Sequence, residues 1–241
     1  MSKISQINYF AIIPAAGSGL RMGGVVPKQY LTVQNKTILE YSIQALLNID
    51  FIKKVVVVLA PDDAYWGSLP LFLTQHPRII TTLGAGERQE SVLNGLKALQ
   101  SEANSNDWVL VHDAARPCLT QADVVQLTEK LAQHPVGGLL GTPVRDTLKR
   151  CFPDGQVQET VCRQNLWHAL TPQMFRYEIL LNALQAALFQ KQTVTDEASA
   201  IELSGAIPLI VSGRADNIKV TMPEDLLLVE RFFTAILERA L

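Results

Sequence analysis

Two cationic side chains stand near the N-terminus, in a loop built from small residues. The stretch 11–30 reads AIIPAAGSGLRMGGVVPKQY, an apolar run followed by alanine, serine and glycine, with Arg21 and Lys28 beyond them. Small residues let backbone N–H groups approach an anion without obstruction by side chains. Two added cations favour a reaction in which negative charge moves, such as phosphoryl or nucleotidyl transfer. The alternative is a tight turn whose two cations are only solvated.

Counting residues in this loop argues against the two commonest phosphate-binding motifs. Gly17 and Gly19 begin a G-x-G-x-x-G dinucleotide fingerprint, but Met22 occupies the third glycine position. Gly19 and Gly24 have the spacing of a Walker A loop, but two valines stand where lysine and serine or threonine are required. The sequence therefore argues against an NAD-dependent oxidoreductase and against a P-loop nucleotidase.

Two later loops carry groups that suit a polyphosphate. GAGERQES places Arg88 among small residues at an expected helix N-terminus, which favours phosphate, although Arg88 could simply pair with Glu87 or Glu90. VHDAARP ends an apolar run with Asp113, and a carboxylate beside a polyphosphate predicts Mg²⁺. Asp113 could instead cap a turn, and Arg116 could reach a phosphate or pair with Asp113.

The elements that must position these loops alternate between strand and helix patterns. Strands are expected at 9–13, 53–60, 78–83, 107–113, 137–144 and 206–211. Helices are expected at 37–47, 62–75, 87–100, 120–133, 176–190, 195–203 and 221–241. This order predicts an α/β fold with a Rossmann-like, mostly parallel sheet and helices on both faces. Thr221 and Glu224 fit a capping box at the last helix.

Ligands in such a sheet lie beyond the carboxyl ends of its strands. The loops 15–28, 60–63, 84–88 and 112–117 are therefore the expected site.

Residues 145–168 break the alternation. DTLKRCF, PDG and QVQETVCR read as two strands joined by a turn. A lone two-stranded hairpin is marginal in water, so this one should dock, either on its own domain or on a second subunit. Spacing alone leaves both open. The expected organisation is one domain over residues 1–241 with this hairpin inserted.

Composition excludes several other classes. A chain of 241 residues, 48% hydrophobic, suits one large domain, and a formal charge of −2 without a long basic run argues against nucleic acid as a partner. Cys118, Cys151 and Cys162 lack C-x-x-C spacing and are expected to be free thiols, and the histidines lack zinc-site spacing. No apolar run has the length of a signal peptide or membrane span, so a cytoplasmic protein is expected.

Taken together, these stretches resemble the 2-C-methyl-D-erythritol 4-phosphate cytidylyltransferase family. The resemblance is carried, in order along nearly the whole chain, by PAAGSGLRMGGVVPKQY, GAGERQESVLNGL, VHDAARP, PVRDTLKR, WHALTPQ, TDEASA and GRADNIKVTMPEDL. It implies a nucleotidyltransferase fold, similar to that of glycosyltransferase-A enzymes. The implied reaction joins CTP and methylerythritol phosphate to give the CDP-alcohol and pyrophosphate, with Mg²⁺ and without a covalent enzyme intermediate.

Two other functions stay open beside this one. A sister cytidylyltransferase for ribitol 5-phosphate would share the nucleotide loop, and the region from Thr147 to Thr195 would distinguish it. A non-catalytic nucleotide-binding module is the other, against which Arg21 and Lys28 argue.

The resemblance also implies a role for each matching residue. Arg21 and Lys28 would stabilise the pentacoordinate transition state, and Lys219 would contact the phosphates of both substrates. The residues implied at the CTP site are Ala15, Ala16, Gly17, Ala85, Gly86, Arg88, Ser91 and Ala114. Those implied at the methylerythritol phosphate site are Asp113, Arg116, Thr171, Thr195 and Lys219, with Thr147 and Arg163 reaching it from the hairpin of a partner subunit in a homodimer.

Asp113 would also hold Mg²⁺. One departure concerns Ala85 and Gly86, which stand where family members often have glycine and aspartate, so a ribose or base contact is expected to be weaker.

Overall fold

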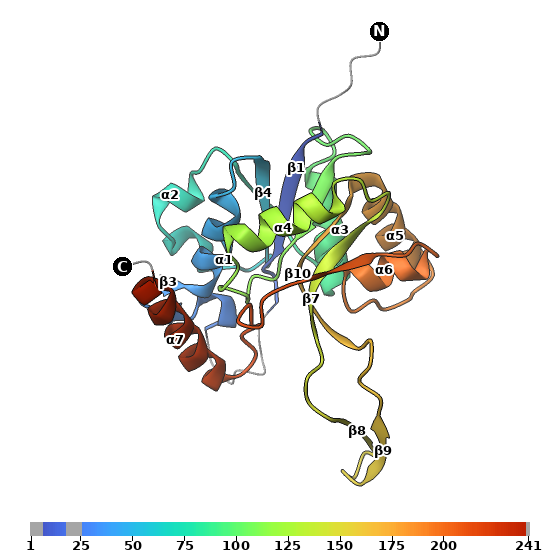
Figure 1. Cartoon of the computed structure of the whole chain (residues 1–241). Helices are drawn as coiled ribbons and strands as arrows, with labels where there is room; N and C mark the ends of the chain where they lie inside the picture. The colour runs from blue at the N-terminus through green and yellow to red at the C-terminus, as the bar shows by residue number, and fades with distance from the viewer. Residues whose placement is uncertain (1–6, 18–25, 240–241) are drawn as a thin grey trace.

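The fold is organised around one central sheet (Figure 1). In the computed structural model, residues 7–17 and 26–239 are described. Seven strands form the sheet in the order β11-β7-β10-β6-β1-β4-β5. Their bounds are β1 Tyr9–Pro14, β4 Ile52–Leu59, β5 Ile79–Leu83, β6 Trp108–Val111, β7 Gly137–Pro143, β10 Trp167–Arg176 and β11 Leu209–Ser212. Every neighbouring pair is parallel except those that include β10, which confirms the mostly parallel sheet.

Strand β10 is absent from the sequence-based expectation. It lies antiparallel between β6 and β7, in the interior of the sheet. Its register with β7 is interrupted between Ala169 and Gln173, and Pro172, which has no N–H to donate, lies in the interruption. The proline breaks the alternating pattern by which a strand is recognised, although Gln173 to Phe175 are buried.

Helices cover both faces of the sheet, as expected. Their bounds are α1 Ile38–Leu47, α3 Arg88–Ala98, α4 Gln121–Leu131, α5 Tyr177–Phe189, α6 Glu197–Leu203 and α7 Pro223–Arg239. Alternate residues of β1 enter two different apolar clusters, because successive side chains of a strand point to opposite faces. Ala11 and Ile13 pack with α1 and α4, whereas Phe10 and Ile12 pack with α3, α5 and α6.

The prediction of one continuous helix over 62–75 is wrong. Only a 3₁₀ turn, η3 Trp66–Ser68, and the single turn α2 Leu71–Thr74 form there. Pro70 separates them, since proline disfavours helix for the residue before it and lacks an N–H.

The capping box predicted at the last helix is also wrong, because its acidic residue is a different one. The helix begins at Pro223, and the carboxylate of Asp225, not Glu224, accepts from the backbone N–H groups of Thr221 and Met222. The true N-terminus is one residue later than the sequence pattern suggested.

Short elements follow the N-terminal loop. The 3₁₀ turn η2 Lys28–Tyr30 leads into a small hairpin, β2 Thr32–Val33 and β3 Lys36–Thr37, whose turn has Gln34 and Asn35 at positive φ. Thr37 then caps α1 through a capping box with Glu40.

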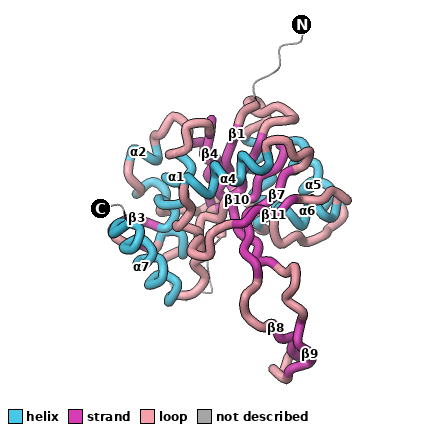
Figure 2. Tube along the Cα trace, viewed as in Figure 1, coloured by secondary structure: helices cyan, strands magenta, loops and turns pink. Residues whose placement is uncertain are grey.

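The hairpin expected within 145–168 is present as β8 Leu148–Cys151 and β9 Val157–Val161. It projects away from the rest of the chain, and its two strands pair only with each other (Figures 1 and 2). Most of its side chains are exposed.

Candidate active site

A cavity of about 400 Å³ lies at the carboxyl ends of β1, β5 and β6. It is lined by Pro14, Ala15, Ala16, Gly17, Lys28, Gln29, Ala85, Gly86, Glu87, Arg88, Ser91, Asp113, Ala114, Ala115 and Lys219. Three of the four expected loops therefore meet there. The loop 60–63 does not line the cavity, but Asp63 accepts a 2.7 Å hydrogen bond from the hydroxyl of Tyr30 and so supports η2.

The loops after β1 and β5 pack against each other because Gly84 has no side chain. A Cβ at Gly84 would lie 2.4 Å from that of Ala16 and 2.8 Å from the Ser91 hydroxyl. The Ser91 hydroxyl accepts from the backbone N–H of Ala85 at 3.1 Å. Ser91 thus shapes the second loop while it lines the cavity.

Gln29 holds the first loop and was missed in the sequence analysis. Its amide nitrogen donates to the carbonyl oxygens of Ala15 at 2.7 Å and Gly17 at 3.0 Å. The two ends of a trans peptide unit point in opposite directions, so this bond turns the N–H of Ala16 away from Gln29. The PKQY motif could have indicated this residue, but only its lysine was singled out.

Lys28 lies at the far end of the same loop. Its ammonium donates to the carbonyl oxygen of Val220 at 3.1 Å, which brings η2 against the segment that carries Lys219. Both lysines line the cavity, as the sequence analysis expected. Arg21, the other cation expected in this loop, lies outside the described residues.

Asp113 lies at the centre of a cationic cluster at the end of β6. Its carboxylate accepts from Arg88 at 3.1 Å and from Lys219 at 2.9 Å, and the Arg116 Nε lies 3.5 Å away. Burial raises the pKa of this carboxyl, but Arg88, Lys219 and Arg116 outweigh burial and hold the pKa well below its usual range. Asp113 is therefore ionised at any working pH and fixes three cations at one place.

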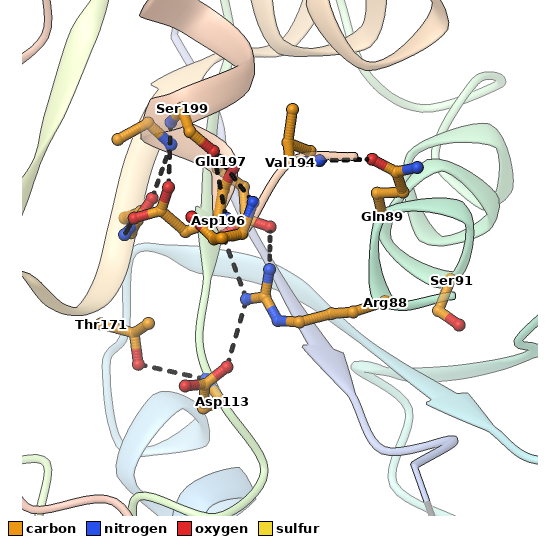
Figure 3. A network of polar contacts seen from close by, with 12 residues as sticks. Arg88, Gln89, Ser91, Asp113, Thr171, Val194, Asp196, Glu197 and Ser199 are labelled. Atoms are coloured by element: carbon orange, nitrogen blue, oxygen red, sulfur yellow. Dashed lines mark hydrogen bonds and ion pairs between the residues drawn. The ribbon is translucent and has the colours of Figure 1, made fainter. Parts of the chain in front are cut away.

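Arg88 has a second acidic partner, which the sequence analysis did not identify. Its guanidinium donates to both oxygens of Glu197, at 2.6 and 3.1 Å, as well as to Asp113 (Figure 3). The pairing with Glu87 or Glu90, kept open from the sequence, is not the arrangement found. Burial lowers the pKa of Arg88, but the Glu197 and Asp113 carboxylates outweigh it and raise the pKa above its ordinary value.

Behind Asp113, a fully buried histidine connects two segments of the site. His112 Nε2 lies 3.0 Å from the carbonyl oxygen of Arg116, so Nε2 carries the proton and Nδ1 accepts from the Thr171 hydroxyl at 2.9 Å. The Thr171 oxygen in turn accepts from the N–H of Asp113 at 3.1 Å. Burial lowers the pKa of His112 to about 4, so the ring is neutral near pH 7.

A second cavity, of about 190 Å³, adjoins the first. Arg88, Asp113 and Lys219 line both. The second cavity also contains Arg116, Ala169, Leu170, Thr171, Gln173, Thr195 and Asp196. The residues expected around the phosphorylated alcohol are thus brought together here, apart from the two on the hairpin.

Thr147 and Arg163 lie elsewhere. Both are exposed beside β8 and β9 and line neither cavity of their own chain. Within one chain, the structure does not bring them to the site.

The residues around Asp113 fit a metal ion only if most of the ion's ligands come from outside the protein. Among the described residues, no group of three histidine, cysteine, aspartate or glutamate side chains could hold a metal ion. The Asp113 carboxylate faces three cations, so it cannot serve as one acid of a protein-made cage. It fits Mg²⁺ that takes its other ligands from nucleotide phosphates and water, as Mg²⁺ does in many nucleotide sites.

A mostly parallel sheet with two adjoining cavities, bordered by lysines and arginines at its carboxyl edge, fits an α/β nucleotidyltransferase. The family model described as "IspD: 2-C-methyl-D-erythritol 4-phosphate cytidylyltransferase" matches residues 9–235. The chain belongs to this family, which confirms the resemblance found in the sequence.

Relatives and solved structures agree with this assignment. The chain is 49% identical over 230 residues to 2-C-methyl-D-erythritol 4-phosphate cytidylyltransferase of Vibrio vulnificus (strain YJ016), covering 95% of this chain and 96% of the relative. It is 50% identical over 231 residues to the enzyme of the same name from Escherichia coli O1:K1 / APEC, covering 95% of each.

Among solved structures, a 4-diphosphocytidyl-2C-methyl-D-erythritol synthase gives a TM-score of 0.82 at 36% identity and covers 95% of this chain and 100% of that one. The 2-C-methyl-D-erythritol 4-phosphate cytidylyltransferase of Francisella tularensis gives 0.78 at 34% identity, covering 92% and 98%. In the described part of the chain, no helix is long and apolar enough to cross a membrane.

Proposed function

We propose that this protein transfers a cytidylyl group from CTP to 2-C-methyl-D-erythritol 4-phosphate, giving 4-diphosphocytidyl-2-C-methyl-D-erythritol and pyrophosphate in isoprenoid precursor synthesis. The observation that carries the proposal is the pair of adjoining cavities that share Arg88, Asp113 and Lys219. Two substrates can therefore meet at one charged boundary. The family of the chain names the substrates.

The larger cavity is proposed to take CTP. Its wall includes the backbone of Ala16 and Gly17, and nothing lies within 4 Å of a Cβ built on Gly17. Such backbone can contact phosphate oxygens closely. Ala85, Gly86, Arg88 and Ser91 are proposed to hold the cytosine and ribose side, and Ala114 lines the same cavity.

In the proposed reaction, an oxygen of the substrate phosphate attacks the α-phosphorus of CTP. A new P–O bond forms as the bond to the β-phosphate oxygen breaks, and pyrophosphate leaves with the electron pair. Lys28, Lys219 and Arg21 are proposed to stabilise the charge on the transferring group. Because no bond to the enzyme forms, catalysis consists of positioning and charge stabilisation.

Mg²⁺ is proposed as the cofactor, held by Asp113 together with the phosphates of CTP. When bound, the ion neutralises phosphate charge and supplies Lewis-acid assistance. Asp113 itself orients Lys219 through their 2.9 Å ion pair. A cytoplasmic location is part of the same proposal.

A substrate panel at fixed CTP tests the function. Pyrophosphate release with methylerythritol phosphate is expected to exceed release with ribitol 5-phosphate by at least about 100-fold, which corresponds to about 2.7 kcal/mol. The opposite preference would assign the sister activity. A folded protein that binds CTP and releases no pyrophosphate with either alcohol would be a nucleotide-binding module.

The same assay tests Lys28. Lys28→Ala is expected to lower kcat at least about 100-fold, because a cation beside the transferring phosphoryl group is removed. Lys97→Ala, an exposed lysine in the last turn of α3, is the matched control and should stay near wild type. A rate within about tenfold of wild type in Lys28→Ala would refute the assigned role.

We further propose a homodimer in which the hairpin supplies Thr147 and Arg163 to the neighbouring site. The support is their exposure on an element that projects away from the chain's own cavities (Figure 1). Lys28→Ala and Arg163→Ala proteins, mixed and allowed to exchange subunits, should regain about a quarter of wild-type activity, since half of the dimers would contain one intact site. No recovery after verified exchange would mean that the hairpin serves its own chain.

A further inference from the structure

Glu197 carries a buried negative charge for which the proposed reaction has no use. We propose that Glu197 is a positioning residue that acts through Arg88 to hold Asp113 and Lys219 at the boundary between the two cavities. The inference rests on the proposed function and concerns its acceptor side. Glu197 itself lines neither cavity.

The pairing of Glu197 is obligatory. The residue is 1% exposed, and a carboxylate that deep in a protein requires a charged partner. That partner is Arg88, whose guanidinium meets both carboxylate oxygens, at 2.6 and 3.1 Å. Two parallel bonds to a planar fork fix the plane of the guanidinium as well as its position.

The orientation that Glu197 imposes is passed on to Asp113. The same Arg88 nitrogen, Nη2, that donates to one oxygen of Glu197 also donates to Asp113 Oδ1 at 3.1 Å (Figure 3). Asp113 Oδ2 then accepts from Lys219 at 2.9 Å. The three residues linked in this way, Arg88, Asp113 and Lys219, are the ones that line both cavities.

The negative charge of Glu197 determines where the Arg88 guanidinium lies. With Glu197 present, the positive charge of Arg88 is matched locally, and the guanidinium stays between α6 and β6. Without that charge, Arg88 is drawn away from Asp113 Oδ1 by nucleotide phosphates in the larger cavity. Asp113 and Lys219 then lose their fixed geometry on the acceptor side, whereas the cation remains available to CTP.

A purely structural role for the same ion pair makes a different prediction. If Glu197 only joins α6 to α3, its loss lowers the fraction of folded protein and leaves both KM values unchanged. If it positions the acceptor site, the KM for methylerythritol phosphate rises and the KM for CTP does not. The KM split therefore separates the two roles.

Glu197→Gln is the test variant, because it keeps the shape and one acceptor oxygen and removes the charge. We expect kcat to fall at least tenfold and the KM for methylerythritol phosphate to rise at least fivefold, with the KM for CTP within twofold. Glu202→Gln, exposed on the same helix, is the control and should match wild type. Unchanged KM values for both substrates in folded Glu197→Gln would overturn the proposal.

A double variant keeps the test decisive if Glu197→Gln folds poorly. Arg88→Gln with Glu197→Gln removes both charges of the pair, and its rate should lie within about threefold of Arg88→Gln alone, since Glu197 acts through Arg88. Losses that multiply would overturn the inference. Failure of the proposed function is recognised separately, as absence of pyrophosphate release by wild type. In that case a crystal structure of Glu197→Gln is the test. Arg88 is expected to have left its wild-type position beside Asp113 Oδ1, and an unmoved Arg88 would overturn the inference.

Discussion

The ion pairs at the end of β6 and the ion pair on the hairpin use the same chemical groups in opposite surroundings. Arg88 and Glu197 approach to 2.6 Å with 30% and 1% of their side chains exposed, whereas Arg150 and Glu159 approach to 2.7 Å with 59% and 55% exposed. Distance alone would rank them as equals. Burial separates them, because water screens the exposed pair and cannot solvate the buried carboxylate.

The two regions also differ in what each pair is connected to. Arg150 and Glu159 face each other across β8 and β9, and the strands pair with no other part of the described sheet. The buried pair continues through Asp113 to Lys219 and Arg116. A change in the hairpin pair should therefore stay local, and a change in the buried cluster should reach the boundary between the two cavities.

The largest effect is expected for Asp113→Asn. The substitution leaves Arg116 and Lys219 without their acid and removes one of two acids from Arg88. We expect the free energy of unfolding to fall by about 3 kcal/mol, as when one partner of a buried ion pair is removed. We expect kcat to fall at least about 100-fold, because Lys219 is no longer oriented.

Urea unfolding and pyrophosphate release measure these two effects. Asp50→Asn, an exposed carboxylate in the turn before β4, should change neither by a measurable amount. Wild-type stability in Asp113→Asn would mean that water screens the buried cluster as effectively as it screens the hairpin pair. Burial would then not separate the two regions.

The next effect is a pH dependence that belongs to the buried region. Burial lowers the pKa of His112 to about 4, below the value of about 6.5 expected in an unfolded chain. The unfolded chain therefore takes up a proton first as pH falls, so stability present above pH 6.5 is lost on the way to pH 4. Between pH 7.5 and 5 this loss is about 2 kcal/mol.

A variant that cannot titrate isolates this contribution. In His112→Gln, the fall in unfolding free energy between pH 7.5 and 5 should be smaller by about that amount, even though the variant starts less stable. His168→Gln, which removes an exposed imidazole from β10, is the matched control. Equal slopes in wild type and His112→Gln would show that the ring is not held neutral by burial.

The sequence alone was enough to predict the site residues whose chemistry is indicated by a local motif. The small-residue loop predicted Lys28, and the ends of expected parallel strands predicted Arg88 and Asp113 at one edge. The strand–helix alternation predicted the layers for a similar reason, since periodicity is a local property. Position on a strand end was enough because the sheet itself brings those ends together.

The missed residues are those whose role depends on a distant partner. Arg88 and Glu197 are 109 positions apart, and nothing near Glu197 distinguishes it from an exposed acid at the start of a helix. Gln29 and His112 act through backbone carbonyls, which a one-letter sequence does not display. Strand β10 was missed because Pro172 interrupts its pattern and its stability comes from two neighbouring strands.

The smallest effect is expected for the hairpin pair. Arg150→Ala should change the free energy of unfolding by less than about 0.5 kcal/mol, and a double-mutant cycle with Glu159→Ala should give a coupling energy of similar size. The cycle is measured at a concentration where the protein sediments as a monomer, because a partner subunit lying over the hairpin would exclude water. A coupling above about 1 kcal/mol in the monomer would contradict the exposure of this hairpin. A coupling energy that appears only as the protein concentration rises would mean that assembly buries the hairpin pair. The two regions would then differ in burial only in the monomer.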